Sequence, residues 1–258
     1  MSDPTTFVLL ASILQPLEDG ADAILDFFHD DVGFAWDTSI IALTVVVRAV
    51  LIPLTYKQIK GMRALQALQP QIKELQEKYK NDRQRQQQEM MRFWQANKIN
   101  PLSSCMPLLL QLPVFFALFQ LLQSDSFEDK VNATGGQSWL FIDSVVENPG
   151  WSPEGLVLMA LFMGSMALSS LVMIRSSPSG AGNQQYILLG AFALMGIFFV
   201  PGFPAGLSIY WITTNFWTVG QQYAAAKLIP APDVTAPEGA MAAAKAPPPP
   251  PRKRKKRR

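Results

Sequence analysis

A single arginine, Arg48, interrupts an apolar run that is long enough to cross a membrane. The run SIIALTVVVRAVLIPLTY covers residues 39–56, and Arg48 stands near its middle. A charged side chain at that depth costs about 2.5–3.5 kcal/mol on membrane-insertion scales. The rest of the chain must therefore supply this guanidinium with water or with a hydrogen-bonding partner.

The apolar stretches hold no residues that predict catalysis. They contain no Asp or Glu, and the chain has no GxSxG, HExxH or phosphate-binding motif. Ser169, Ser170 and Ser208 have no His or Lys within these stretches to activate them, and small residues there favour close helix packing. Cys105 stands alone, so it forms no disulfide within the chain and no metal cluster. We expect His29 to be an ordinary solvated residue, and we expect no enzyme activity, metal or cofactor.

Arg48 could escape the membrane interior by reaching the nearer headgroups, but the distance is long. It lies nine residues before Lys57, or roughly 13 Å along a helix that rises about 1.5 Å per residue. The guanidinium covers only part of that distance. Because the apolar stretches hold no acidic residue, a salt bridge within the membrane part of the chain is excluded as well. We interpret Arg48 as a cation in a hydrated groove, held for a partner outside the chain.

Polar residues in three apolar stretches are candidates to line that groove with Arg48. Thr44 and Thr55 share a helical face with it, and polar side chains recur in two later stretches. The candidate groove residues are Arg48, Thr44, Thr55, Gln111, Tyr210 and Trp211.

The composition predicts an all-α membrane protein. The 258 residues are 49% hydrophobic and 16% charged, with a mean hydropathy of +0.13, and the charges are segregated along the chain. A spanning helix needs about 20 apolar residues. Five stretches reach or approach that length, and we predict five transmembrane helices. They are residues 39–56, 104–122, 155–174, 185–200 and 205–222.

The lysines and arginines predict the orientation of these helices. Segments 57–103, 175–184 and the tail after residue 222 carry 20 of them, whereas residues 1–38 carry none and residues 123–154 carry only Lys130. Positive charges favour the cytoplasmic side. We therefore expect an extracytoplasmic N-terminus and a cytoplasmic C-terminus, which agrees with an odd number of spans.

Three segments flank or interrupt the core at 39–222. Residues 1–38 should lie outside, with an interfacial or partly disordered lead-in at 7–14 and an amphipathic surface helix at 16–35. Residues 57–100 should form a cytoplasmic helical hairpin that turns at 80–83 and has a thin apolar seam. The hairpin is either a working part or a passive solvated loop. The Ala/Pro-rich tail at 223–258 ends in RKRKKRR.

Long and specific motifs carry a family resemblance across roughly residues 16–225. The run VRAVLIPLTYKQIKGMRALQALQPQIKELQEKYK and the later QQQEMMRFWQANKINPLSSCMPLLLQLPVFFALFQLL, WLFID and PAGLSIYWITTN resemble the YidC/Oxa/Alb family of membrane protein insertases, in its short bacterial form. The resemblance implies a five-helix bundle in the bacterial cytoplasmic membrane, with a cytoplasmic hairpin between the first two core spans. Larger members also have an outer domain and an extra first span.

The resemblance also implies a mechanism and a set of partners. The arginine that matches Arg48 lines a groove open to the cytoplasm and to lipid, where it transiently receives the acidic tail of a nascent membrane protein. Substrate would first contact the hairpin, for which the candidates are Met90, Phe93 and Trp94. The basic end would touch the ribosome or anionic lipids, through Arg252, Lys253, Arg254, Lys255, Lys256, Arg257 and Arg258. Cooperation with a Sec translocon stays open, and nothing indicates DNA binding.

Two other function classes compete with an insertase. Arg48 could select anions in a channel or transporter, although a pore should show polar stripes along whole spans and the outer halves here are apolar. The chain could also be an inert structural membrane protein.

Overall fold

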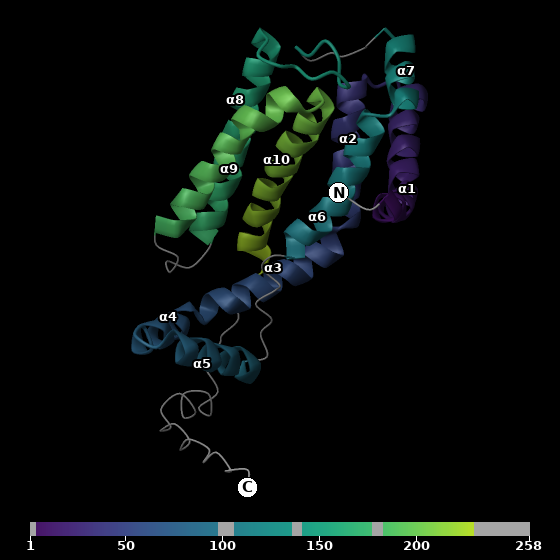
Figure 1. Ribbon diagram of the computed structural model, residues 1–258. Helices are drawn as coiled ribbons and strands as arrows, with labels where there is room; N and C mark the ends of the chain where they lie inside the picture. The colour runs from purple at the N-terminus through teal and green to yellow at the C-terminus, as the bar shows by residue number, and fades with distance from the viewer. Residues whose placement is uncertain (1–3, 98–105, 136–140, 177–182, 230–258) are drawn as a thin grey trace.

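The computed structural model is a helical bundle with a smaller helical arm (Figure 1). It describes residues 4–97, 106–135, 141–176 and 183–229, and no strand occurs in those ranges. Helices α2, α6, α8, α9 and α10 form the bundle, α1 and α7 lie along one side of it, and α3 leads out to α4 and α5. The elements are α1 Pro4–Asp26, the π-helical turn η1 Phe27–Asp31, α2 Trp36–Val50, α3 Ile52–Ala67, α4 Gln69–Lys78, α5 Arg83–Ala96, α6 Met106–Leu122, α7 Asp125–Ala133, α8 Pro153–Ser176, α9 Asn183–Gly202 and α10 Ala205–Leu228.

Length and hydropathy identify fewer membrane-crossing helices than the five predicted spans. Among the described residues, one helix is by itself long and apolar enough to cross a membrane, Pro153–Met173 of α8, with a mean hydropathy of 2.1. Helices α2 and α3 are long and apolar enough only when they are taken together as one bent span. Gln111–Leu122 of α6 is apolar but shorter. The all-helical fold agrees with the prediction, while the count of five spans stays a prediction.

The first predicted span, 39–56, is not one straight helix. Helices α2 and α3 meet at Leu51 with a bend of 62°. Pro53 lies in the first turn of α3, where its missing N–H is tolerated, but the same missing donor prevents α2 from continuing through this position. Arg48 therefore lies in the last turn of α2, just before the bend, rather than in the middle of a helix.

The start of α10 is held against the core by a close backbone approach. The N–H of Gly206 donates to the carbonyl of Val145 at 2.8 Å, and the N–H of Ala205 donates to that of Glu147 at 3.0 Å. These bonds satisfy two donors that a helix start leaves open. A Cβ at Gly206 would lie 2.8 Å from Ile40 Cδ1, so glycine lets α10 pack tightly against α2.

Helix α1 differs from its prediction in extent. It is helical from Pro4, through the segment 7–14 for which we expected an interfacial or partly disordered lead-in. It packs along α6 and α2 (Figure 1), and its predicted place at the outer membrane surface stays a prediction. Leu25 is fully buried, and Ala21 and Ile24 pack against the core. The apolar face of α1 is therefore covered by protein in part, while Leu17 stays 45% exposed.

His29 is buried, so the prediction of a solvated side chain is wrong. Its ring stacks on that of Trp36 with centroids 3.9 Å apart, and its Nδ1 lies 2.7 Å from the carbonyl oxygen of Phe34. Trp36 also meets Phe127 of α7 edge to face. The acidic residues around His29 in the sequence had suggested that its side chain is exposed to solvent. The π-helical turn between α1 and α2 instead places the ring against Trp36, the first residue of α2.

A lysine on α7 holds α1 in place through two carboxylates. Lys130 Nζ donates to both oxygens of Asp22 and of Asp26, which lie one turn apart, at 2.8–3.0 Å. Burial alone would lower the pKa of Lys130, but the hydrogen bonds and attraction from Asp22 and Asp26 outweigh it and raise the pKa above its ordinary 10.5. Because these side chains are about one-third exposed, solvent weakens the pairs to roughly 1 kcal/mol or less each.

Helices α4 and α5 form a hairpin with its own small core. Asp82 begins α5 as its N-cap and accepts from the N–H of Arg85 at 3.0 Å, which places the turn close to the predicted 80–83. The buried residues of the seam are Ile72, Leu75 and Met90, and Leu65, Tyr79, Phe93 and Trp94 pack against them.

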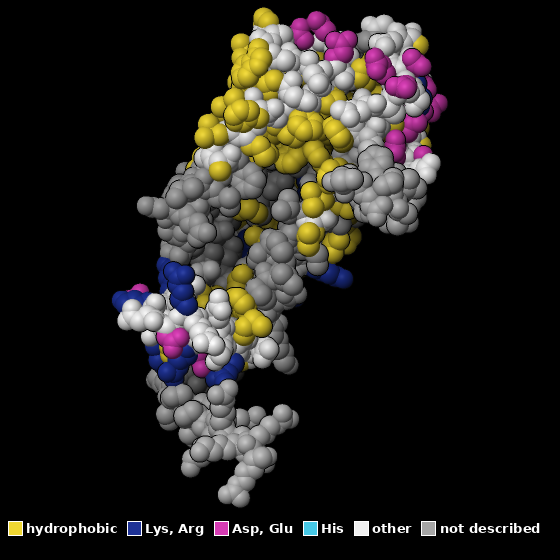
Figure 2. Space-filling view, viewed as in Figure 1, with side chains coloured by type: hydrophobic (Ala, Val, Ile, Leu, Met, Phe, Trp, Pro, Cys, Tyr) yellow, Lys and Arg dark blue, Asp and Glu magenta, His cyan; other side chains and the backbone are white. Residues whose placement is uncertain are grey.

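Charges of opposite sign gather at opposite ends of the molecule. On the face in Figure 2, Asp and Glu cluster at the end that carries α1 and α7, whereas Lys and Arg cluster around α4 and α5. Apolar side chains cover much of the bundle between them. This separation is what the positive-inside count predicts, and the orientation itself stays a prediction.

Replacing Lys130 with methionine should loosen α1 from α7, because Asp22 and Asp26 then face each other without a cation. We expect a loss of about 1 kcal/mol, measured as a lower Tm of the purified protein in detergent. The raised pKa means that the lysine stabilises fully below about pH 10.5, and that the difference between the two proteins shrinks as pH rises through the higher folded-state pKa.

Lys80→Met is the matched control, because it breaks the exposed Lys80–Glu77 pair of the hairpin. Its Tm should equal that of the parent protein. Equal losses in both variants would contradict a specific role for Lys130.

Candidate functional site

Three helices bring a chain of hydrogen-bonded polar side chains together at Arg48. Arg48 donates from Nη2 to Oε1 of Gln111 on α6, at 2.7 Å. Nε2 of Gln111 donates in turn to the hydroxyl oxygen of Tyr210 on α10. Tyr210 is buried, whereas Arg48 and Gln111 are half-buried. The structure thus brings three of the predicted site residues into contact, and we call this set the polar chain.

Arg48 has a neutral partner in the described part of the protein. The ion pairs among the described residues lie within the hairpin and between α7 and α1, and none of them includes Arg48. A guanidinium keeps its charge in proteins and has five N–H donors. Its place in the last turn of α2 is favourable, because a helix C-terminus carries partial negative charge. The arrangement therefore holds a positive charge in place without neutralising it.

The two threonines of the predicted site have different surroundings. The hydroxyl of Thr44 is buried and donates to a backbone carbonyl one turn earlier at 2.7 Å, so it is used within α2. Thr55 lies beyond the bend, in α3. Its hydroxyl donates to the carbonyl of Leu51 at 2.9 Å and accepts from Nε2 of Gln221 at 3.2 Å. Thr55 therefore joins α3 to α10, and the bend takes it off the straight stripe that the sequence suggested.

Trp211 packs in an aromatic cluster instead of the polar chain. Its ring centroid lies 5.4 Å from that of Phe115, 5.5 Å from Phe199 and 6.1 Å from Phe162. Adjacent residues point about 100° apart around an α-helix, so Trp211 and Tyr210 face different neighbours. The prediction that both line one groove with Arg48 is not supported for Trp211.

Gln58 is a buried polar residue that sequence reasoning did not single out. It is 6% exposed, lies one turn after Thr55 on α3, and has no hydrogen-bond partner for either amide atom. Leaving such a group unpaired costs about 1–3 kcal/mol. Its spacing of three residues from Thr55 was the available signal. Thr55 and Gln58 are therefore two buried polar side chains of α3 beyond the bend.

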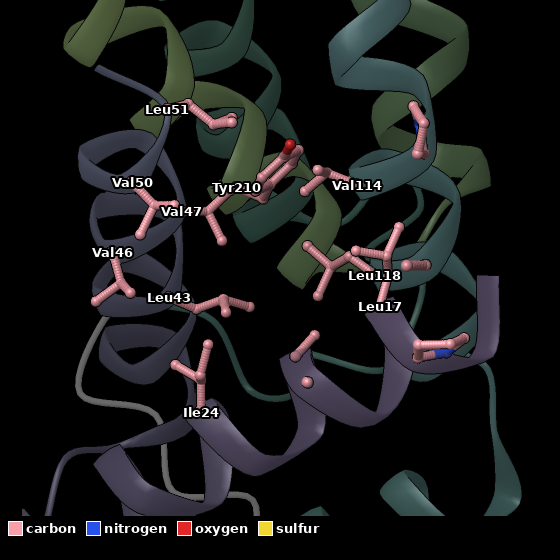
Figure 3. A pocket seen from close by; sticks show the side chains of 15 residues that line it. Leu17, Ile24, Leu43, Val46, Val47, Val50, Leu51, Val114, Leu118 and Tyr210 are labelled. Carbon is pink, nitrogen blue, oxygen red and sulfur yellow. The ribbon is translucent and has the colours of Figure 1, made fainter. Parts of the chain in front are cut away.

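A cavity of about 420 Å³ lies next to the polar chain, between α1, α2 and α6 (Figure 3). Leu43 and Val47 of α2, with Leu51 at the bend, face Val114 and Leu118 of α6 across it. The ring of Tyr210 closes one side. The full lining is Pro16, Leu17, Gly20, Ala21, Ile24, Leu43, Val46, Val47, Val50, Leu51, Pro113, Val114, Ala117, Leu118 and Tyr210. Unlike the hydrated groove we expected around Arg48, this cavity is apolar.

The predicted substrate contacts of the hairpin lie in and beside its seam, and their role in contacting substrate stays a prediction. Met90 is buried in the seam, and Phe93 and Trp94 are half-buried against it. Their helical spacing is that of an internal face. Met91, which sequence reasoning did not name, lies next to Met90 on α5 and is 55% exposed.

The basic residues 252–258 lie outside the described residues. In the described ranges, no three His, Cys, Asp or Glu side chains group closely enough to hold a metal ion.

Comparisons with known proteins agree with the fold. A model of the family described as 60Kd inner membrane protein matches residues 27–232. A membrane protein insertase YidC of Clostridium perfringens is 33% identical over 222 residues, which cover 83% of this chain and 87% of that protein. A membrane protein insertase YidC of Streptomyces avermitilis is 35% identical over 232 residues, which cover 80% of this chain and 54% of that protein.

A solved structure, the crystal structure of an active YidC insertase with its first transmembrane domain resolved, has the same fold. Its TM-score is 0.62 at 22% identity, covering 83% of this chain and 46% of that one. The chain thus spans about half the length of some relatives and most of the length of others. Because the family model covers most of the sequence, the chain belongs to the 60Kd inner membrane protein family, the family of the YidC insertases.

Proposed function

We propose that this chain is a membrane protein insertase and chaperone. It receives nascent membrane proteins in a hydrophilic groove that is open to the cytoplasm and to lipid, and it releases them into the bilayer without nucleotide hydrolysis. The observation that carries the proposal is the neutral partner of Arg48, Oε1 of Gln111 at 2.7 Å. The relatives named as membrane protein insertases support the same reading.

A charge held by a neutral amide can exchange partners. A carboxylate about 4 Å from Arg48 would gain about 4 kcal/mol at an effective dielectric constant of 20. A carboxylate is a stronger acceptor than the amide oxygen of Gln111, so an acidic tail would displace or share that bond. Had the chain placed its own Asp or Glu beside Arg48, the tail would have to compete with a permanent ion pair.

Release requires that the attraction be matched by another force. Moving one negative charge outward across the membrane potential gains roughly 2.3 kcal/mol per 100 mV. This is similar to the attraction at Arg48, so the cation draws an acidic tail into the groove without trapping it there. The apolar segment of the substrate then partitions into lipid, which needs no nucleotide.

The remaining parts take supporting roles in this proposal. With the N-terminus outside and the C-terminus in the cytoplasm, the hairpin of α4 and α5 makes the first contact with substrate, and exposed Met91 offers an apolar surface for it. The basic end 252–258 contacts the ribosome or anionic lipids. Whether a Sec translocon takes part is left to experiment.

Replacing Arg48 with alanine should lower the insertion of substrates with acidic outer tails at least tenfold, because the attraction in the groove is lost. Insertion is measured as protease protection of the tail in vesicles that contain the purified protein. Arg48→Lys should retain part of the activity, because it keeps the charge but loses the planar geometry of the guanidinium.

The matched control uses a substrate with the same transmembrane segment and a neutral tail. The Arg48→Ala protein should insert it nearly as well as the parent does. Normal insertion of the acidic-tailed substrate by Arg48→Ala would refute the groove mechanism. Anion conductance that depends on Arg48 would instead favour the competing channel or transporter function.

Gln111→Glu is a sharper test, because it places a carboxylate where the amide oxygen lies 2.7 Å from Arg48. The internal ion pair should lower insertion of acidic-tailed substrates about tenfold, as Arg48→Ala does, while the Tm does not fall. Gln111→Met, which removes the bond without adding charge, should stay within about twofold of the parent protein. Full activity of Gln111→Glu would show that an unneutralised cation is not required.

A further inference from the structure

We propose that the cavity between α1, α2 and α6 is a binding site for one acyl chain of a membrane phospholipid. The cavity has a volume of about 420 Å³, within the range of small-molecule sites. The inference rests on the membrane location of the family, and not on the insertase function.

The chemistry of the walls excludes water as the natural occupant. A buried water needs two to four polar partners. The side chains that line the cavity are aliphatic, apart from Tyr210, and its hydroxyl already accepts a hydrogen bond from Gln111. An apolar space of this size left empty would deprive its walls of dispersion contacts on one side. A hydrocarbon chain supplies those contacts without needing any polar group.

The rim of the cavity connects it to the apolar exterior of the protein. The cavity is partly open, and two of its lining residues are also exposed, Leu17 of α1 to 45% and Val50 of α2 to 72%. In a membrane protein such apolar side chains face the bilayer hydrocarbon, as does the exposed Leu168 of α8. An acyl chain can therefore enter from the surrounding lipid without crossing a polar surface.

Glycine keeps the cavity open on the side of α1. Gly20 lies in the interior of the helix, where glycine costs about 1 kcal/mol relative to alanine. A Cβ built there meets no atom within 4 Å, so the backbone borders open space rather than a packed neighbour. Close packing therefore does not require this glycine, and a large side chain at this position would fill part of the cavity.

The site also touches the polar chain. The ring of Tyr210 forms part of the wall (Figure 3). Its hydroxyl belongs to the polar chain, in which Gln111 connects it to Arg48. A bound acyl chain would thus pack against the residue that positions Gln111. Tyr210 would therefore connect a bound acyl chain to the hydrogen bonds around Arg48.

The test uses the full chain in phospholipid vesicles that contain a trace of phosphatidylethanolamine with a photoreactive diazirine in its acyl chain. After irradiation, mass spectrometry maps the labelled residues. We expect labelling at Ala21, Val47 and Val114 within the cavity, as well as at Leu168 on the outer face of α8. Gly20→Leu should reduce the cavity labelling about tenfold and leave Leu168 unchanged.

Gly164→Leu is the matched control, because a Cβ at Gly164 also meets no atom within 4 Å but lies on α8, away from the cavity lining. It should leave the cavity labelling unchanged. Ala117→Leu fills the cavity from α6 and should lower the cavity labelling in the same way. It replaces Gly20→Leu in the test if that variant fails to fold.

Three results would overturn the proposal. The first is a parent protein that is labelled at Leu168 but not in the cavity. The second is cavity labelling that both filling variants leave unchanged. The third is cavity labelling that Gly164→Leu lowers as much as Gly20→Leu does. A failure of insertion in any variant would bear on the proposed function and not on this labelling.

Discussion

The hydrogen bond between the guanidinium of Arg48 and the neutral amide of Gln111 is the interaction on which the account depends. A charge inside an apolar bundle must be hydrated or bonded, and an internal carboxylate would have done this most strongly. The amide of Gln111 accepts a hydrogen bond from Arg48 without cancelling the positive charge of the guanidinium. The position of Arg48 in the last turn of α2 also suits a cation, because a helix C-terminus carries partial negative charge.

The surrounding structure separates the polar chain from two apolar regions. Trp211 and its phenylalanine neighbours fill the space between α6, α8, α9 and α10, and the cavity beside α1 borders Tyr210 from the other side. Helix α1 stays beside α2 and α6 through packing and through the link from Lys130. The polar chain is thus enclosed by hydrocarbon on two sides, which concentrates electrostatic attraction at Arg48.

Sequence reasoning predicted the parts that depend on local pattern. The apolar runs predicted helices, Asp82 lies in the predicted turn, and the lone charge indicated Arg48. It failed where tertiary packing decides: His29 is buried on Trp36 despite its acidic neighbours. Polarity alone grouped Arg48, Gln111 and Tyr210 as candidates to line one groove, whereas the hydrogen bonds that connect them could be known only from coordinates.

Chemical access to position 48 tests the central claim most directly. In a Cys105→Ser background, Arg48→Cys should react with a membrane-impermeant, water-soluble thiol reagent added from the cytoplasmic side and not from the outer side. Val50→Cys, which is more exposed but faces apolar surroundings, should not react from either side. Absence of reaction at position 48, or equal reaction from both sides, would contradict a recess that is wet, open to the cytoplasm and closed outside.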